Sequence, residues 1–172
     1  MLAAQAISCN KEEKPSYDCE LMIIDPYPNM IVRSNFRILI MERVENIPLS
    51  TFNVLDESDI LFIDTSHVIK TGNDMAYEYL KVLPTIKKGV FIQAHDIMLP
   101  YEYPKERLLK KHIFWNEQYL LQAFLTFNSA FKVIWASCFM HRNHSNKLAE
   151  AFKEYNATPL IPPGSFWFQR IC

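Results

Sequence analysis

Polar side chains capable of acid–base or metal chemistry follow two apolar runs of the sequence. Asp64 and His67 follow the run ILFI, and the pair His95 and Asp96 follows the run VFIQA. Carboxylates with open coordination positions suit Mg²⁺, and a metal-bound hydroxyl loses its proton more readily than a free one. An imidazole, with an ordinary pKa of about 6.5, can take that proton directly. Asp64, His95 and Asp96 are therefore candidate metal ligands, and His67, His95 and Asp64 are candidate catalytic residues.

The elements that must position these residues are short strands separated by helices. Six apolar segments bounded by proline, glycine or polar residues are predicted as strands: 20–25, 36–42, 59–64, 89–97, 131–140 and 165–171. Apolar residues at helical spacing lie between the later strands. They are Met75, Tyr79, Leu80 and Leu83; Trp115, Tyr119, Leu120, Phe124 and Phe127; and Leu148, Phe152 and Tyr155 after a Ser145 cap. This alternation is typical of an α/β fold with a mostly parallel sheet covered on both faces.

Three of the predicted strands end on acidic or imidazole side chains. The first ends at Asp25, the third at Asp64, and the fourth at His95 and Asp96. Ligands of open α/β sheets bind outside the carboxyl ends of the strands. We therefore expect these side chains to face one site.

Length and composition indicate an ordinary globular domain. The chain has 172 residues, 49% hydrophobic and 22% charged, which favours a single domain over residues 1–172. A net charge of -1 without long runs of one sign gives no reason to expect nucleic acid or an anionic membrane as a partner. No apolar run reaches the roughly 18 residues of a membrane span. The four cysteines, without CxxC spacing, favour a reducing cytoplasm.

Two nucleotide-binding motifs are excluded by the glycines. DILFID resembles a Walker B strand, but that site also requires a GxxxxGK[ST] loop. A dinucleotide fold requires GxGxxG after an early strand. The chain has three glycines, Gly72, Gly89 and Gly164, and none lies in either setting.

Several of these segments together carry a resemblance to a known family. The segments are IDPYP, DILFIDTSHVIKTGNDMAYEYLKVLPTIKKGVFIQAHDIMLPYEYP, FWNEQYLLQAFL and GSFWFQRI. In this order and spacing they resemble class I S-adenosylmethionine-dependent methyltransferases, of the bacterial branch related to macrocin O-methyltransferase and cephalosporin hydroxylase-type proteins. The resemblance covers roughly residues 5–171. It implies a Rossmann-like methyltransferase sheet, mostly parallel with an antiparallel last strand.

The resemblance implies a role for each polar residue. Asp25 matches the acid that accepts hydrogen bonds from the ribose of the cofactor, S-adenosylmethionine. Asp64 matches the acid after the family's fourth strand and is a second cofactor-binding candidate. His95 and Asp96 match the polar pair after the fifth strand, where metal-dependent relatives place a divalent ion, here expected to be Mg²⁺. The implied reaction is O-methylation of a small hydroxylated acceptor, with His67 or His95 as the base.

The sequence departs from the family at its first strand. The family begins with a central strand and a glycine-rich turn of the type E-x-G-x-G, and MLAAQAISCNKEEKPSYD matches the helix after that turn. We therefore expect a sheet that lacks its first strand, and weakened cofactor affinity. An unpaired inner strand would also favour a homo-oligomer, because free strand edges recruit partners.

Each polar residue also has a purely structural interpretation. Asp25 can cap a turn, and Asp64 can cap the helix after TSHVIKTG. His67 can be satisfied by backbone groups. His95 and Asp96 can form a hydrogen-bonded pair that orders the loop MLPYEYP.

Two other functions remain as hypotheses beside methyl transfer. A catalytically inactive methyltransferase-fold remnant or interaction domain would follow from the missing glycine-rich strand. A metal-dependent hydrolase using Asp64, His95 and Asp96 is less favoured and would turn over without a methyl donor. The segment WNEQYLLQAFL is interpreted as a core-facing helix, in which Glu117 complements the positive helix start.

Overall fold

The computed structural model describes residues 2–158 and 162–172, which fall into two compact units, Met1–Ile47 and Pro48–Cys172. The first unit contains α1 (Leu2–Glu13), β1 (Met22–Ile24), α2 (Met30–Asn35), β2 (Ile38–Ile40) and η1 (Val44–Asn46). β1 and β2 form a two-stranded parallel sheet.

The first unit has little apolar core of its own. Pro26 follows β1 and, lacking an N–H, helps to end that strand. α2 is capped by Asn29, whose side chain accepts a hydrogen bond from the N–H of Val32 at 3.0 Å. Among the described residues of this unit, Ile47 is the one buried hydrophobic side chain.

The second unit contains the larger sheet and most of the helices. Its elements are η2 (Leu49–Val54), β3 (Ile60–Ile63), α3 (Asp74–Tyr77), η3 (Glu78–Val82), α4 (Leu83–Thr85), β4 (Phe91–Ala94), α5 (Lys105–Leu109), α6 (Glu117–Leu125), β5 (Phe131–Ala136), α7 (Ser137–Asn143), α8 (Ser145–Ala151) and β6 (Phe166–Arg170). The segments α3, η3 and α4 follow one another without a break. η3 is a π-helical turn directly before Pro84, which has no N–H to continue regular helical hydrogen bonding.

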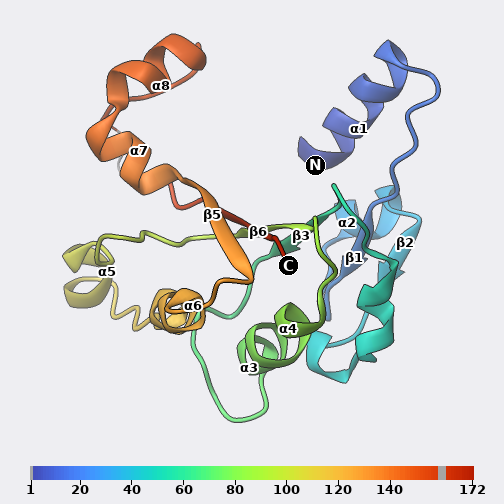
Figure 1. The fold of residues 1–172 in the computed structure, drawn as a ribbon, viewed down its shortest axis with the longest axis horizontal. Helices are drawn as coiled ribbons and strands as arrows, with labels where there is room; N and C mark the ends of the chain where they lie inside the picture. The colour runs from blue at the N-terminus through green and yellow to red at the C-terminus, as the bar shows by residue number, and fades with distance from the viewer. Residues whose placement is uncertain (1, 159–161) are drawn as a thin grey trace. The chain divides into compact units, whose positions relative to one another are not determined.

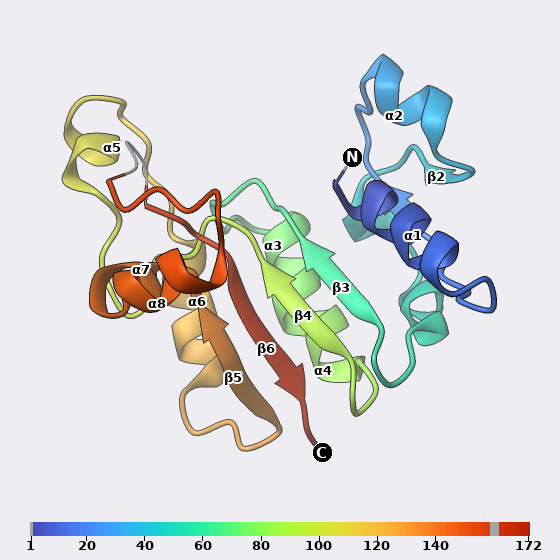
Figure 2. The same cartoon turned by 90° about the horizontal axis from the view of Figure 1, so that it is seen from above.

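The four-stranded sheet has the order β3-β4-β6-β5 (Figure 2). β3 and β4 are parallel, whereas β6 lies between β4 and β5 and is antiparallel to both. The prediction of an α/β fold is confirmed, with a mixed sheet of four strands in this unit. β3 pairs with β4 alone among the described residues. Pairing of its other edge with a second copy stays a prediction.

One face of this sheet is covered by α3, α4 and α6, while α7 and α8 lie on its other side (Figures 1 and 2). The fully buried side chains come from the strands and from these covering helices. They include Ile63, Ile92 and Phe168 from the sheet and Met75, Tyr79, Leu83 and Leu121 from the helices. This core fixes the carboxyl ends of β3 and β4.

Several sequence-based predictions of local structure are wrong. The helix predicted to carry Leu148, Phe152 and Tyr155 after a Ser145 cap is α8, which ends at Ala151 and has His144 as its N-cap. The strand predicted over 131–140 ends at Ala136 and α7 begins at the next residue, because the last sheet contact is the hydrogen bond from the N–H of Ser137 to the carbonyl of Ser165. The face of α6 was also misassigned, since Tyr119 is 44% exposed while Glu117 and Gln118 are buried. The polar start of α6 is buried because its side chains bind the loops described below.

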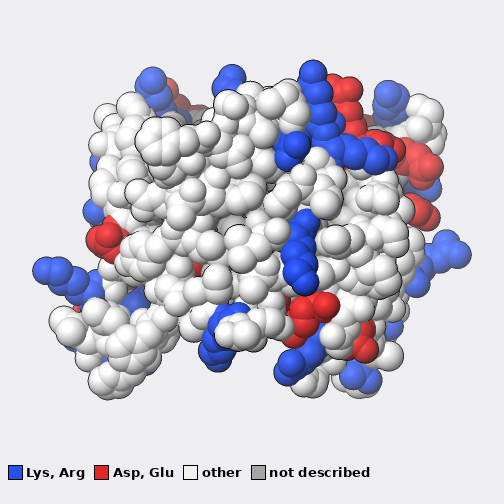
Figure 3. All heavy atoms as spheres, turned by 60° about the horizontal axis from the view of Figure 1, so that its bottom comes forward, with Lys and Arg blue, Asp and Glu red and all other residues white. Residues whose placement is uncertain are grey.

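No described helix is long and apolar enough to cross a membrane. On the face drawn in Figure 3, basic and acidic side chains are interspersed. This pattern agrees with the near-zero net charge.

Candidate functional site

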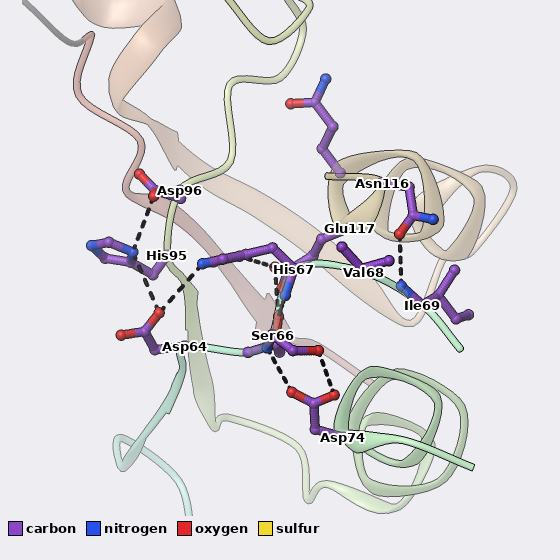
Figure 4. Close-up of polar contacts among 12 residues, drawn as sticks. Asp64, Ser66, His67, Val68, Ile69, Asp74, His95, Asp96, Asn116 and Glu117 are labelled. Carbon is purple, nitrogen blue, oxygen red and sulfur yellow. Dashed lines mark hydrogen bonds and ion pairs between the residues drawn. The ribbon is translucent and has the colours of Figure 1, made fainter. Parts of the chain in front are cut away.

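Asp64, His67 and His95 meet at the carboxyl ends of β3 and β4 (Figure 4). Ile63 and Ala94 are the last paired residues of the two parallel strands, so Asp64 and His95 emerge side by side. The Oδ1 atom of Asp64 lies 3.6 Å from Nε2 of His67 and 3.6 Å from Nδ1 of His95. One ligand atom from each residue lies within 4.8 Å of the other two. We refer to these three residues as the strand-end cluster.

His67 is oriented by a buried carboxyl group. Its Nδ1 lies 2.6 Å from Oε2 of Glu117, which is fully buried at the start of α6. The backbone of His67 has a φ of 59°, in the left-handed region that is uncommon for residues other than glycine. Its N–H donates to Oγ1 of Thr65 at 2.8 Å, and its carbonyl accepts from the N–H of Asn116 at 3.0 Å. These bonds hold the imidazole in one orientation.

The hydrogen-bond network around Glu117 assigns the protons. The hydroxyl of Tyr79 donates to Oε1 at 2.7 Å, and that of Thr65 donates to Oε2 at 2.7 Å. Thr65 donates here because a carboxylate can only accept, and its oxygen also accepts from the backbone N–H of His67. A carboxylate that receives two hydroxyl donors accepts a third hydrogen bond from Nδ1–H of His67. Nε2 of the neutral imidazole therefore carries the free lone pair, on the side of Asp64.

The electrostatic surroundings of His67 make its imidazole a stronger base. Burial by itself lowers the pKa of the imidazole, but the hydrogen bond that His67 donates to Glu117 and the negative charges of Glu117, Asp64 and Asp96 outweigh burial and raise that pKa. Burial, together with the charge of Glu117, raises the pKa of Tyr79 well above its ordinary value. Tyr79 is thus a neutral donor to Glu117.

The first residues of α6 also hold the two loops that carry the cluster. Oδ1 of Asn116 accepts from the N–H of Ile69 at 2.7 Å in the loop after β3. Gln118 accepts from the N–H of Met98 at 3.1 Å and donates to the carbonyl of Tyr101 at 3.2 Å in the loop after β4. The start of α6 is therefore a clamp on both loops, and Figure 4 shows its contact with the loop after β3, between Asn116 and Ile69.

Asp96 takes a different position from the cluster. Its Oδ2 is 3.9 Å from Nδ1 of His95, beyond hydrogen-bond distance, and its Oδ1 is 3.5 Å from Nη2 of Arg107. Arg107 is itself buried and stacks on Trp115 at 4.4 Å. A Cβ at Gly164 would lie 2.8 Å from Cα of Asp96, so glycine permits this close approach. Asp96 contributes to the order of its loop and is not among the three residues of the cluster.

Asp25 belongs to the first unit, and the strand-end cluster belongs to the second. It follows β1, is half-buried, and its Oδ1 accepts from the N–H of Tyr27 at 2.8 Å. The structural interpretation of Asp25 as a turn cap is therefore confirmed. Its other oxygen makes no hydrogen bond with a described residue.

The structural interpretations of Asp64 and His67 are wrong. The helix after TSHVIKTG is capped by Asn73, whose side chain accepts from the N–H of Ala76, and Asp64 takes no part in it. The side chain of His67 is satisfied by Glu117 rather than by backbone.

The donor atoms of the strand-end cluster do not match the family's Mg²⁺. Mg²⁺ prefers oxygen ligands in near-octahedral geometry and retains several waters. The cluster offers one carboxylate and two imidazoles. The residues present therefore do not fit Mg²⁺.

Two apolar grooves lie beside β5. The first is lined by Leu99, Pro100, Trp135, Phe139 and Phe166 among others, and the second by Ile60, Phe91, Leu148 and Trp167 among others. Neither lining includes Asp64, His67 or His95. The cluster is instead open to solvent through the half-exposed side chains of Asp64 and His95.

Glu117 is the functional residue that sequence reasoning missed. Because Glu117 lies at a helix start, the sequence suggested that it only complements the helix dipole. A single sequence has no pattern that distinguishes a buried acid from an exposed one. The available signal was the run Asn116, Glu117 and Gln118 directly before an apolar helix.

Comparisons of the chain with protein-family models, with curated proteins and with solved structures found no match. The resemblance to methyltransferases therefore depends on the sequence segments alone.

Proposed function

We propose that the chain is an S-adenosylmethionine-dependent methyltransferase that methylates a hydroxyl group of a small acceptor, within a Rossmann-like sheet of the methyltransferase type. The observation that carries the proposal is the strand-end cluster. It lies where open α/β sheets bind ligands, and it combines a carboxylate with two imidazoles. A reducing cytoplasm remains the proposed compartment, since all four cysteines are free.

The cluster is suited to activate the acceptor oxygen. A hydroxyl is a poor nucleophile until its proton is removed or its pKa is lowered. The free lone pair on Nε2 of His67, with Asp64 3.6 Å away, is directed to the place where that oxygen would be held. Glu117 stabilises positive charge that develops on the imidazole, much as a buried carboxylate does in a catalytic triad.

Asp25 is the residue proposed to bind the cofactor. Its unpaired oxygen fits a ribose hydroxyl, and the cofactor would supply the methyl group when bound. The second cofactor-binding candidate, Asp64, is assigned to the acceptor side because both imidazoles face it.

The proposal is tested by calorimetric titration of the purified chain with S-adenosylhomocysteine. We expect saturable binding that is lost in Asp25→Ala and retained in Asp18→Ala, a matched control at an exposed acid of the same unit. Transfer of labelled methyl groups to hydroxylated acceptors would then be assayed. No binding by a folded sample would contradict the proposal and support the inactive remnant.

The donor set of the cluster favours a second candidate, a metal-dependent hydrolase. Two histidines with one carboxylate and an open position also form catalytic zinc sites. Hydrolysis of an ester or phosphoester without any methyl donor, abolished by His95→Ala, would identify this activity.

A further inference from the structure

The strand-end cluster presents the donor set of a transition-metal ion. One carboxylate oxygen and two imidazole nitrogens are borderline ligands that suit Zn²⁺, Co²⁺ or Fe²⁺ better than Mg²⁺. Three protein ligands leave coordination positions open for a substrate or water.

Two of the three distances within the cluster suit one shared ion, and the third, between the imidazole nitrogens, is at most 4.8 Å. Asp64 Oδ1 is 3.6 Å from a nitrogen of each histidine, too long for a hydrogen bond. Two ligand atoms bound at about 2.1 Å in a tetrahedral site lie about 3.4 Å apart. The carboxylate oxygen and each imidazole nitrogen therefore already have nearly the separation that coordination requires.

A buried nitrogen of His95 supports the same interpretation independently. Nδ1 of His95 is buried from solvent and makes no hydrogen bond with any described residue, although the side chain as a whole is 46% exposed. A buried polar atom without a partner lowers the stability of the folded chain. Coordination of a cation by Nδ1 would satisfy this atom.

Glu117 supplies the outer support that metal-binding histidines require. A ligating imidazole almost always donates its other N–H to a carboxylate or carbonyl, which fixes its orientation and raises its basicity. His67 does this through Nδ1 to Glu117, and Glu117 is fixed in turn by Tyr79 and Thr65. The support exists without any ion, so the site is preorganised.

We propose that Asp64, His67 and His95 bind one divalent transition-metal ion of the Zn²⁺ type, with Glu117 as the positioning residue of His67. The ion's role, to hold the acceptor oxygen and lower the pKa of its hydroxyl, rests on the proposed function. The binding of the ion depends on the geometry of the cluster alone.

The test is a calorimetric titration of the chelator-stripped chain with Zn²⁺ and with Mg²⁺, without methyl donor or acceptor. We expect one Zn²⁺ per chain, bound at least about 100-fold more tightly than Mg²⁺. Titration with Co²⁺ should give the visible absorption of a low-symmetry nitrogen and oxygen site. The near-ultraviolet band of a thiolate ligand should be absent, which separates this site from the exposed Cys9, Cys19 and Cys172.

Variants locate the ion within the cluster. His95→Ala and Asp64→Asn change exposed side chains and should each weaken Zn²⁺ binding at least about 10-fold. His112→Asn is the matched control: it removes an exposed histidine outside the cluster and keeps a residue that tolerates its φ of 52°. It should leave the affinity unchanged.

The positioning role of Glu117 has its own readout. Glu117→Gln, in a sample whose circular dichroism is unchanged, should weaken Zn²⁺ binding by about 10–100-fold and alter the Co²⁺ spectrum. If that variant does not fold, His95→Ala and Asp64→Asn still decide the proposal.

Three outcomes would overturn the inference: no Zn²⁺ binding by the folded chain, binding unaffected by both His95→Ala and Asp64→Asn, or equal affinity for Mg²⁺. Zn²⁺ binding without S-adenosylhomocysteine binding would support the metal site and contradict methyl transfer. The reverse result would contradict the metal site alone.

Discussion

Asp25 and Asp64 each follow the last residue of a short parallel strand, yet the two carboxylates have different surroundings. Asp25, after β1, accepts one hydrogen bond from a turn two residues away. Asp64, after β3, faces two imidazoles, one of which is held by a buried carboxyl group from a residue 50 positions away in sequence. The contacts of Asp25 are local, whereas those around Asp64 depend on the tertiary fold.

The difference comes from what supports each strand pair within its own unit. β3 and β4 lie in a four-stranded sheet with fully buried residues, and α6 clamps the loops that leave both strands. Among the described residues, β1 and β2 have only each other as hydrogen-bonded strands, and the segment after β1 is bound from α2 through Nε of Arg33, which donates to the carbonyl of Pro28 at 2.9 Å. A strand-end acid therefore becomes part of a preorganised cluster where a second element fixes its neighbours.

This comparison is tested most strongly by removing, in separate variants, the buried carboxyl group of Glu117 that supports the cluster and the carboxyl group of Asp25. Glu117→Ala leaves the Tyr79 and Thr65 hydroxyls and Nδ1–H of His67 without their acceptor in a buried site. It should lower the free energy of unfolding by about 3–5 kcal/mol. Asp25→Ala removes one hydrogen bond in a turn and should cost less than about 1 kcal/mol. Urea unfolding followed by far-ultraviolet circular dichroism measures both; equal losses would mean that the network around Glu117 adds no more than a surface turn does.

The cores of the two sheets provide the next contrast. Ile92 in β4 is fully buried, so Ile92→Ala should cost about 2–5 kcal/mol through lost burial and the cavity left behind. Ile23 in β1 is only half-buried, and Ile23→Ala should cost about 1 kcal/mol or less. Thermal unfolding midpoints of the two variants rank these losses. A larger loss for Ile23→Ala would show that the first unit is packed more tightly than its burial indicates.

The sequence predicted the strands of this fold better than the faces of its helices. Each of the six predicted strands contains an observed one, because apolar runs bounded by proline, glycine and polar residues are a local signal. The extent of the fifth was wrong because β6, its partner, ends the pairing near Ser165, a contact that the local sequence does not contain. The face of α6 was wrong because aromatic spacing dominated the pattern, while the buried face at its start is polar.

The same limit applies to the candidate site. The positions of Asp64, His67 and His95 after their strands were readable because parallel strands end at one edge of a sheet. Glu117 is 50 residues from His67 and 38 from Tyr79, so no spacing in the sequence connects them. The exclusion of Asp96 from the cluster was equally hidden, since it depends on Arg107 and on the approach of Gly164.

A pair of tyrosine variants tests whether the support around Glu117 is strong because its hydrogen bonds are buried or only because they are numerous. Tyr79 and Tyr119 each donate a hydroxyl to a carboxyl group, Tyr79 to buried Glu117 and Tyr119 to exposed Glu102. Tyr79→Phe leaves one oxygen of a buried carboxyl group without its donor and should lower the free energy of unfolding by about 1–3 kcal/mol. Tyr119→Phe exposes its acceptor to water and should cost less than about 0.5 kcal/mol. Each variant deletes one hydroxyl oxygen. If urea unfolding gives similar losses of unfolding free energy for the two variants, each hydrogen bond contributes the same whether it is buried or exposed. A larger loss for Tyr79→Phe would show that the hydrogen bond stabilises the fold because water is excluded around Glu117. The same exclusion of water strengthens the bond that holds His67 in place.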